Sequence, residues 1–421
     1  MTLTERHIIK RNDSRFAVID EAAYKSKNLY NATLYAVRQH YFTNNKYLPY
    51  KHVQKQFQDN RQTDYYALPS KVAQWSMKMV EQNFKAYFEA LKDYKNNPKK
   101  YKGMPKPPKY KDKEKGRSVL TYTSQAISKR ELDKNGLLKP SGLDITIPTR
   151  IKYGDIVCVR IVKKPMCYVV EINYKVPDVP LKDDNGKYAS IDLGVSNFAT
   201  VTTNIKKDTP FVISGKEIKS YNRYYNKRVA EYKSILDTRN RQKSSNRLEL
   251  LSFKRMNKVN DFMHKSSRYI VNQLVDKGIT TLVIGKNPGW KQDTNIGKVN
   301  NQNFVFIPYD SFIGKLEYKC RMNGIRVVLC EESHTSKCSF LDSEEICHHD
   351  KYVGKRVKRG LFRTGTGRYV NADVNGSYNI LRKSKPKAFA DGVVGVVVHP
   401  VIIKIGNDIL LGTNLIMSTT K

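Results

Sequence analysis

The sequence predicts a multidomain α+β protein, and three observations support this. The chain has 421 residues, which is enough for two or three domains. Apolar residues with helical spacing fill the stretch from about residue 20 to 94, between two regions of short strand-like segments. Further along the chain, strand-like and helix-like segments alternate, as they do in an α/β sheet.

The N-terminal half is expected to contain a small β-barrel domain interrupted by helices. Residues 1–18 carry β-favouring pieces, and short strands with turn residues return over 118–180. Helices that interrupt a run of strands suggest an insertion, so residues 19–117 are predicted to form a helical domain within the barrel domain. The residues at helical spacing are Tyr30, Leu34, Val37 and Tyr41, followed by Val80, Phe84, Tyr87 and Leu91.

The end of this helical region, residues 92–117, is too rich in proline and lysine for a regular element. It is either a solvated connector or a loop that faces phosphates, and charge alone does not separate the two. Its lysines are interleaved with Tyr94, Tyr101 and Tyr110, a pattern that also suits the backbone and bases of a single nucleic-acid strand.

The C-terminal half is predicted to form an α/β domain over residues 187–384. Neither glycine nor proline occurs between Gly215 and Gly278, and apolar residues keep helical spacing there, so we expect a helical hairpin. Two strand-like runs then bracket a helix over about 311–323. We set residues 385–421 apart as a C-terminal tail and assign it no role.

The composition favours a nucleic-acid partner. The formal net charge is +37 and the pI is near 9.8, and so cationic a surface is most simply explained if phosphates neutralise it. Many ribosome-associated or merely basic proteins share this excess of positive charge, so charge by itself does not exclude that this chain is one of them. The six cysteines form no disulfide-like framework, and no signal pattern or membrane-length apolar stretch is found. We therefore expect a protein of the reducing cytosol, that is, a cytoplasmic one. A prokaryotic, nucleoid-associated location is implied only by a family resemblance that rests on three motifs given below.

Three acids at the ends of strand-like runs or the start of a helix-like one predict a nuclease site. They are Asp192, Glu332 and Asp373. Two divalent cations held close together need several carboxylates from different elements, and Mg²⁺ is the expected ion. The alternatives are a turn-forming role for Asp192, a solvated strand end for Glu332 and a helix cap for Asp373. Glu331 is the reserve ligand.

A cysteine- and histidine-containing insert raises the question of zinc. Cys338 and Cys347 are weak candidate ligands, because the paired short spacings of a zinc ribbon are missing. We therefore expect the insert to fold without zinc. The nearby acids Asp342, Glu344 and Glu345 are expected to be solvated.

Three short motifs resemble those of the TnpB family, which is related to type V CRISPR effectors and to Fanzor proteins. They are Ile191-Asp192-Leu-Gly-Val, Thr335-Ser336-Lys-Cys-Ser and Asn371-Ala-Asp373-Val-Asn, the last being highly specific. The resemblance implies an RNase H-like (RuvC) α/β nuclease domain over 187–384, with a degenerate zinc-ribbon-like insert at 338–370. It also implies that the N-terminal β-barrel is a wedge domain and its helical insertion a recognition domain.

The chain departs from the family pattern at the second nuclease motif. Most of the family ends that strand with Glu, whereas here Ile284 is followed by Gly285 and no acid. Some relatives carry the Glu upstream of the Thr-Ser pair, where this chain has Glu332. The resemblance therefore implies Asp192, Glu332 and Asp373 as the catalytic and Mg²⁺-binding set, with two ions.

The resemblance implies a transposon-encoded RNA-guided DNA endonuclease that cuts next to a short flanking motif. Its partners would be a guide RNA from the transposon end and double-stranded target DNA, with the protein as a monomer or a homodimer. Lys71 and Gln74 are candidates for nucleic-acid contact by position, against the alternative of an ordinary surface helix. Two other functions stay open, namely a nuclease-inactive guided DNA-binding repressor and a strand-transferring transposase.

Overall fold

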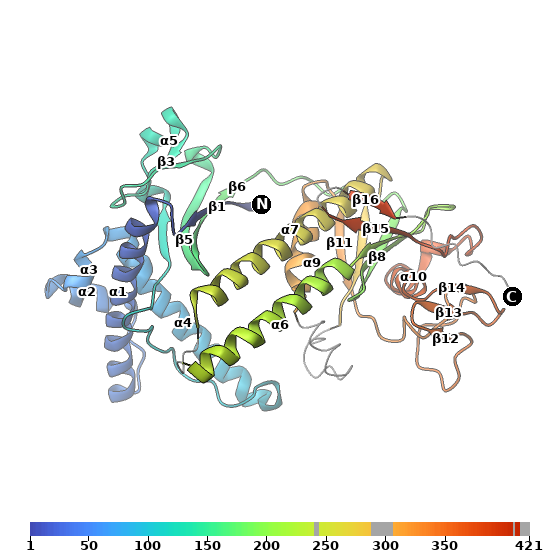
Figure 1. Ribbon diagram of the computed structural model, residues 1–421, viewed down its shortest axis with the longest axis horizontal. Helices are drawn as coiled ribbons and strands as arrows, with labels where there is room; N and C mark the ends of the chain where they lie inside the picture. The colour runs from blue at the N-terminus through green and yellow to red at the C-terminus, as the bar shows by residue number, and fades with distance from the viewer. Residues whose placement is uncertain (240–243, 288–305, 407–408, 413–421) are drawn as a thin grey trace. The chain divides into compact units, whose positions relative to one another are not determined.

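The computed structural model describes residues 1–239, 244–287, 306–406 and 409–412. The chain divides into two compact units, Met1–Pro177 and Asp178–Lys421, each of which has its own sheet and core (Figure 1). Within the described ranges, no helix is both long and apolar enough to cross a lipid bilayer.

Unit 1 is built on a four-stranded antiparallel sheet with a helical insertion. The strand order is β1-β6-β5-β2, and four helices lie between β1 and β2 in the chain. The strands are β1 Thr2–Lys10, β2 Leu120–Thr123, β5 Ile156–Lys164 and β6 Cys167–Lys175, with a separate pair β3 Leu137–Leu138 and β4 Ile147–Pro148. The helices are α1 Arg15–Asn44, α2 Tyr50–Asp59, α3 Thr63–Tyr66, α4 Ser70–Asn96 and α5 Lys129–Asn135. The predicted pair of long helices is confirmed as α1 and α4.

The start of α1 corrects the sequence-based boundary at residue 18. The piece Phe16-Ala-Val-Ile19 favours strands by composition but lies within the helix. Ile19 is fully buried in the same core as Ala23 and Tyr30, so packing of one helix face outweighs the weak β-propensity of these residues.

The basic segment before β2 is fastened to α1 and is not a loose connector. We call residues 105–117 the strap. The side-chain amide of Asn31 accepts from the N–H and donates to the carbonyl of Lys111, both at 2.9 Å. Arg38 donates to the carbonyl of Pro108 at 2.8 Å, and Lys27 donates to that of Lys113 at 2.6 Å. The strap therefore follows α1 and contains a turn in which the N–H of Gly116 donates to the Asp112 carbonyl.

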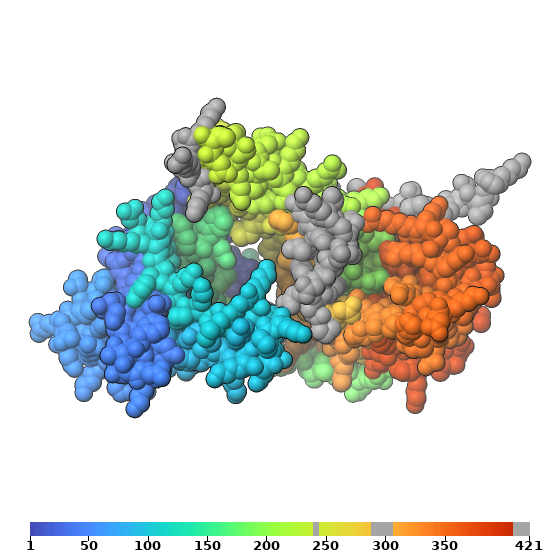
Figure 2. All heavy atoms as spheres, turned by 90° about the horizontal axis from the view of Figure 1, so that it is seen from below, coloured from blue at the N-terminus to red at the C-terminus, as the bar shows by residue number. Residues whose placement is uncertain are grey.

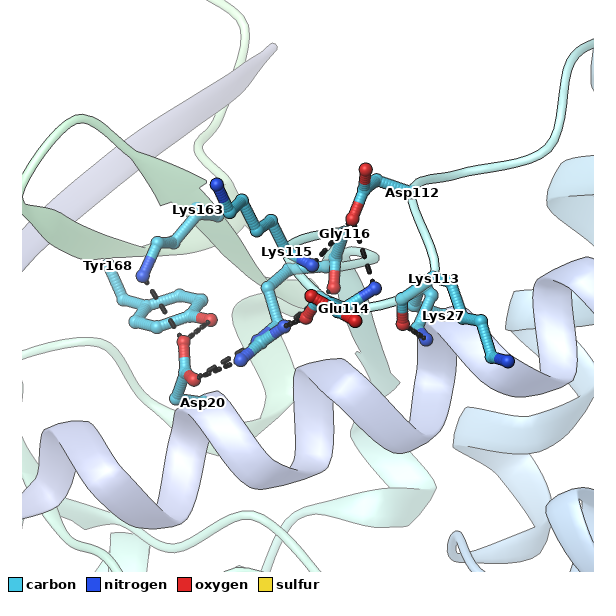
Figure 3. A network of polar contacts seen from close by, with 10 residues as sticks. Asp20, Lys27, Asp112, Lys113, Glu114, Lys115, Gly116, Lys163 and Tyr168 are labelled. Atoms are coloured by element: carbon cyan, nitrogen blue, oxygen red, sulfur yellow. Dashed lines mark hydrogen bonds and ion pairs between the residues drawn. The ribbon is translucent and has the colours of Figure 1, made fainter. Parts of the chain in front are cut away.

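The end of the strap is anchored by Asp20, which meets Lys163 and Tyr168 of the sheet (Figure 3). The carboxylate of Asp20 accepts from Arg117 and Tyr168 at 2.7 Å and from Lys163 at 3.2 Å. Partial burial opposes ionisation, but these three donors outweigh it and lower the pKa of Asp20 to about 2. One carboxylate thus joins α1, the strap and the β5–β6 hairpin.

Unit 2 contains a seven-stranded mixed sheet in the order β11-β10-β7-β8-β9-β15-β16. The strands are β7 Tyr188–Leu193, β8 Asn197–Thr203, β9 Phe211–Ser214, β10 Thr281–Gly285, β11 Arg326–Cys330, β15 Val401–Ile405 and β16 Ile409–Gly412. A small three-stranded sheet has β12 Lys355–Lys358, β13 Leu361–Arg363 and β14 Tyr369–Asn371. The helices are α6 Lys216–Arg239, α7 Asn246–Asp276, α9 Tyr309–Arg321 and α10 Ala372–Ser384. The predicted hairpin is confirmed as α6 and α7, and the predicted β-α-β unit as β10, α9 and β11.

Different helices pack against the two faces of the large sheet. The apolar residues of β7, such as Ile191, share a core with α7 and α9, where Phe198 packs against Phe262 and Phe312. The alternate residues of β7 face α10, because the side-chain period of a strand is two. The segment between β11 and α10, orange in Figure 2, lies at the surface on the face shown there.

The predicted C-terminal tail contributes to this sheet. β15 pairs in parallel with β9 and in antiparallel fashion with β16, and Ile403 and Ile405 belong to the core. The boundary at residue 384 therefore excludes strands that the structure places within the sheet. The sequence did not reveal this, because the partner strand lies about 190 residues earlier in the chain. Residues 407–408 and 413–421 of the predicted tail lie outside the described residues.

Candidate active site

The sheet brings the ends of three parallel strands to one edge. β7, β10 and β11 are adjacent, with Ile191 opposite Ile284 and Gly285 opposite Cys330. The residue after Ile191 is Asp192, so its position on β7 is next to that of Gly285 on β10. Carboxyl ends of parallel strands form the usual place for a ligand site in such sheets.

Asp192 lies on the face covered by α10. A Cβ added at Gly376 of α10 would lie 2.9 Å from Asp192 Oδ2, so the helix approaches this carboxylate closely only because residue 376 has no side chain. Burial, followed by the charges of Glu332 and Asp373, raises the pKa of Asp192 well above its ordinary value, while Arg356 acts in the opposite direction. Asp192 therefore interacts electrostatically with both other predicted acids.

Glu332 follows β11 by two residues and begins a turn. The side-chain oxygen of Asn287 accepts the N–H of Glu332 at 2.8 Å, and the Glu332 carbonyl accepts from the Thr335 hydroxyl at 2.8 Å. Its carboxyl oxygen Oε1 is buried without a hydrogen-bond partner among the described residues. Burial, with a smaller contribution from the charge of Glu331, raises the pKa of Glu332 to about 7.

Glu331 has the opposite environment, which distinguishes the two candidate ligands. Its side chain is half exposed and forms an ion pair of 2.7 Å with Lys383. That hydrogen bond, together with one from Ser333, lowers the pKa of Glu331 to about 2. The buried carboxyl with an unused oxygen is that of Glu332, and Glu331 is already paired at the surface.

Asp373 is not the cap of its helix, although it stands at the start of α10. The cap is Asn371, whose side-chain oxygen accepts from the N–H groups of Asp373 and Val374 at 3.0 and 3.1 Å. The carboxylate of Asp373 is therefore free to face the site. It accepts from Asn197 at 2.6 Å and pairs with Arg356 at 3.4 Å.

A pocket of about 210 Å³ contains Asp192 and Asp373 but not Glu332. It is lined by Asp192, Leu193, Gly194, Asn197, Thr200, Ser336, Arg356, Ala372 and Asp373. Two of these polar residues, Asn197 and Arg356, were not singled out from the sequence. Asn197 opens β8, directly after the motif that contains Asp192, which was the one available signal. Arg356 belongs to a basic run with no pattern of its own.

The donor set suits a hard divalent cation, although the described side chains do not form a ready-made cage. Three carboxyl groups of neighbouring elements and one unused buried oxygen are the ligand types that Mg²⁺ prefers. Among the described residues, no three acidic, histidine or cysteine side chains are gathered closely enough to hold an ion as they stand. Like charges repel when no cation separates them, and here Asp373 pairs with Arg356 instead.

Two family models match regions of the chain that contain the predicted acids. Residues 171–291 match a family model described as a probable transposase, and residues 309–380 match the Cas12f1-like, TNB domain. The TnpB-like protein ORF457 of Acidianus two-tailed virus is 30% identical over 230 residues, which are 52% of this chain and 45% of that protein. Over these regions the chain is similar to a probable transposase and to a TnpB-like protein.

Two further proteins are similar to this chain. The CRISPR-associated endodeoxyribonuclease Cas12f1 of Sulfoacidibacillus thermotolerans is 26% identical over 224 residues, 50% of this chain and 49% of that protein. A solved Cas12f1-sgRNA-target DNA complex has a similar fold, with a TM-score of 0.51 and 16% identity over 88% of this chain and 82% of that one. The matches with the two curated relatives span about half the length of each.

The two matched regions together include all three predicted acids. The first match contains Asp192, and the second contains Glu332 and Asp373. Lys71 and Gln74 lie outside both matches, on the first turns of α4 in unit 1. The side chain of Lys71 is exposed, and the Gln74 amide donates to Ser70 Oγ at 3.4 Å, so neither is engaged in the core.

The insert that resembles a degenerate zinc ribbon is held by carboxylates and amides. Cys338 is buried and its thiol points to the Cys347 carbonyl at 3.8 Å, and the described residues offer no four-ligand cluster. Glu344 is buried and accepts from the N–H groups of Ser339 and Val353 at 2.6 and 2.8 Å.

These contacts correct the expectation of solvation for Glu344 and Asp342, whereas Glu345 is exposed as expected. Asp342 accepts from the Ser339 hydroxyl and from the N–H of Gly365, both at 2.6 Å. Buried backbone N–H groups need acceptors, and carboxylates supply them here. Asn375 and Asn379 of α10 both donate to the Cys338 carbonyl, at 2.9 and 2.8 Å, which fastens the insert to the helix that begins with Asp373.

Proposed function

We propose that this chain is a transposon-encoded RNA-guided DNA endonuclease that cleaves target DNA beside a short flanking motif by two-metal phosphodiester hydrolysis. The observation that carries the proposal is the buried, unpartnered oxygen of Glu332 beside Asp192. A carboxylate in that environment is costly to keep ionised unless a cation or several donors compensate for its lost hydration. The RuvC-type architecture is part of the same proposal.

Asp192, Glu332 and Asp373 would hold the ions, and Asp192 interacts electrostatically with both other acids. Bound Mg²⁺ would supply Lewis-acid stabilisation of the scissile phosphate and a water of lowered pKa. Binding of Mg²⁺ requires all three carboxyl groups to be ionised, so Glu332 and Asp192 would release their protons.

Arg356 and Asn197 extend this site toward the substrate. The guanidinium of Arg356 lies in the same pocket as Asp192 and Asp373, and it is suited to bind phosphate oxygens in two-point fashion. Its present partner is the Asp373 carboxylate, so substrate binding would exchange one anion for another. Asn197 would orient Asp373 through the 2.6 Å hydrogen bond.

The proposed partners are a guide RNA derived from the transposon end and double-stranded target DNA. The net charge of +37 supports binding to both, largely through phosphate contacts that release counterions. Base pairing would select the sequence, and the protein would read duplex shape and the flanking motif. Unit 1 is the candidate wedge and recognition part, with Lys71 and Gln74 as candidates for contact to nucleic acid.

A cleavage experiment tests the proposal. The full chain is purified with its bound RNA, the RNA is sequenced, and the complex is given plasmid DNA with the matching target beside a randomised flanking region. We expect cleavage with Mg²⁺ and none with EDTA. The Asp192→Ala variant should retain the RNA but lose cleavage. Absence of any bound RNA would contradict the guided model, and loss of RNA in the variant would contradict the role of Asp192.

A second candidate is a guided DNA-binding repressor without nuclease activity. It is favoured by the missing acid at Gly285 and by the absence, among the described residues, of a cluster that could hold an ion as it stands. The same complex would then bind the target plasmid without cutting it. A strand-transferring transposase would give joined products in place of cut ones.

A further inference from the structure

We propose that Gly285 is the positioning residue of the active site, because its missing side chain makes the space in which the Glu332 carboxyl lies. A Cβ added at residue 285 would overlap Glu332 Oε1 and would lie 2.8 Å from Glu332 Cγ and 2.6 Å from Ile380 Cδ1. Real Cβ atoms do not tolerate such contacts, so even alanine at this position requires Glu332 to move.

The strand register explains how a carboxyl at this place could come either from residue 285 or from Glu332. Gly285 is the last residue of β10, between β7 with Asp192 on one side and β11 with Cys330 on the other. Its missing side chain would face α10, as shown by the contact with Ile380. That is the face on which Asp192 meets Gly376. A carboxyl carried by residue 285 would therefore lie beside Asp192, in the region that Glu332 now reaches from the neighbouring strand.

The backbone of Glu332 is fixed in this position by the end of β10 itself. The N–H of Lys286 donates to the Cys330 carbonyl at 2.8 Å, and Asn287 accepts the N–H of Glu332 at 2.8 Å. β10 thus supplies both the backbone anchor and the empty space for a carboxyl that belongs to the segment after β11. The glycine and the glutamate form one unit, because a side chain at residue 285 fits only when the Glu332 carboxyl is absent.

Unfolding in EDTA tests this unit without any reference to activity. Full-length Gly285→Ala should unfold at a lower urea concentration than the unmodified chain, whereas the same change in a Glu332→Ala background should have a much smaller effect. Gly314→Ala is the matched control, because a Cβ there meets nothing within 4 Å. Equal effects of Gly285→Ala in both backgrounds would overturn the proposal. If Gly285→Ala does not fold, recovery of folding in the double variant supports the proposal, and failure of both overturns it.

The second experiment measures Mn²⁺ binding to variants, one of which carries the carboxyl at residue 285 instead of residue 332. It rests on the proposed role of Glu332 as a metal ligand. Mn²⁺ binding, followed by calorimetry, should weaken about 10-fold or more in Gly285→Ala. It should be lost in Glu332→Ala and return in the double variant Gly285→Glu with Glu332→Ala. Failure of the double variant to regain Mn²⁺ binding would contradict the exchange. If the unmodified chain itself binds no Mn²⁺, the proposed function fails, and the unfolding comparison still decides the role of Gly285.

Discussion

Glu332→Gln should make the metal-free protein more stable at alkaline pH while removing its activity. Burial raises the pKa of Glu332 from its ordinary value of 4.5 to about 7. A folded-state pKa above the unfolded value means that stability is greatest when the group is protonated and is lost as the pH rises through the two values. A rise of this size corresponds to about 3 kcal/mol at pH 8, and partial solvent access reduces it to roughly 2 kcal/mol.

The structure supplies a matched control in the preceding residue. Glu331 is paired with Lys383, and its pKa is lowered to about 2, so its ionised form contributes to stability above about pH 4. Glu331→Gln should therefore be neutral or slightly destabilising at pH 8, in contrast to Glu332→Gln. A glutamine at position 332 has nearly the volume of glutamate and carries no charge, so the difference isolates the cost of ionisation.

The assay is urea unfolding of full-length protein in EDTA at pH 5 and pH 8, followed by fluorescence. We expect the gain for Glu332→Gln to be about 2 kcal/mol larger at pH 8 than at pH 5. Mg²⁺ should then stabilise the unmodified chain but not the variant, because only the former gains a ligand. A variant that gains nothing at pH 8, or gains equally at both pH values, would refute the assigned cost of the buried carboxylate.

Three further outcomes are expected. Arg356→Ala should reduce cleavage by roughly 10²-fold with little change in Mn²⁺ affinity, whereas Lys355→Ala on the same strand should cut normally; equal rates for both would exclude Arg356 from the reaction. Burial lowers the pKa of Lys319 to about 8, so the stability of the unmodified chain to urea should rise between pH 7 and 10. Lys319→Met should lose that rise, and a variant with an unchanged pH profile would locate its origin elsewhere. Asp20→Asn should increase amide hydrogen exchange in the strap at pH 7, and unchanged protection would show that Asp20 does not anchor it.

Much of the fold was readable from local patterns. Helical spacing located α1, α4 and the α6–α7 hairpin, because a helix that packs against a core must repeat its apolar face along the chain. The two strand-like runs on either side of α9 located that helix. The strands beside Asp192 and Gly285 were recognised as short runs of β-favouring residues. The errors occurred where a partner far away in the sequence decided the structure, as in Phe16–Ile19 of α1 and in β15, which finds its partner in β9.

The sequence by itself determined which acids deserved study, because Asp192 and Asp373 stand in short motifs that resemble those of the TnpB family. Both acids also lie within the regions that match the two family models. Only the tertiary structure distinguished Glu332 from Glu331, since two adjacent glutamates look alike until one is buried and the other meets Lys383. In the linear sequence, Gly285 stands where most of the family has a glutamate, so an acid appeared to be missing. In three dimensions Gly285 is the space that the carboxyl of the next strand occupies, because neighbouring strands share an edge that the linear sequence does not show.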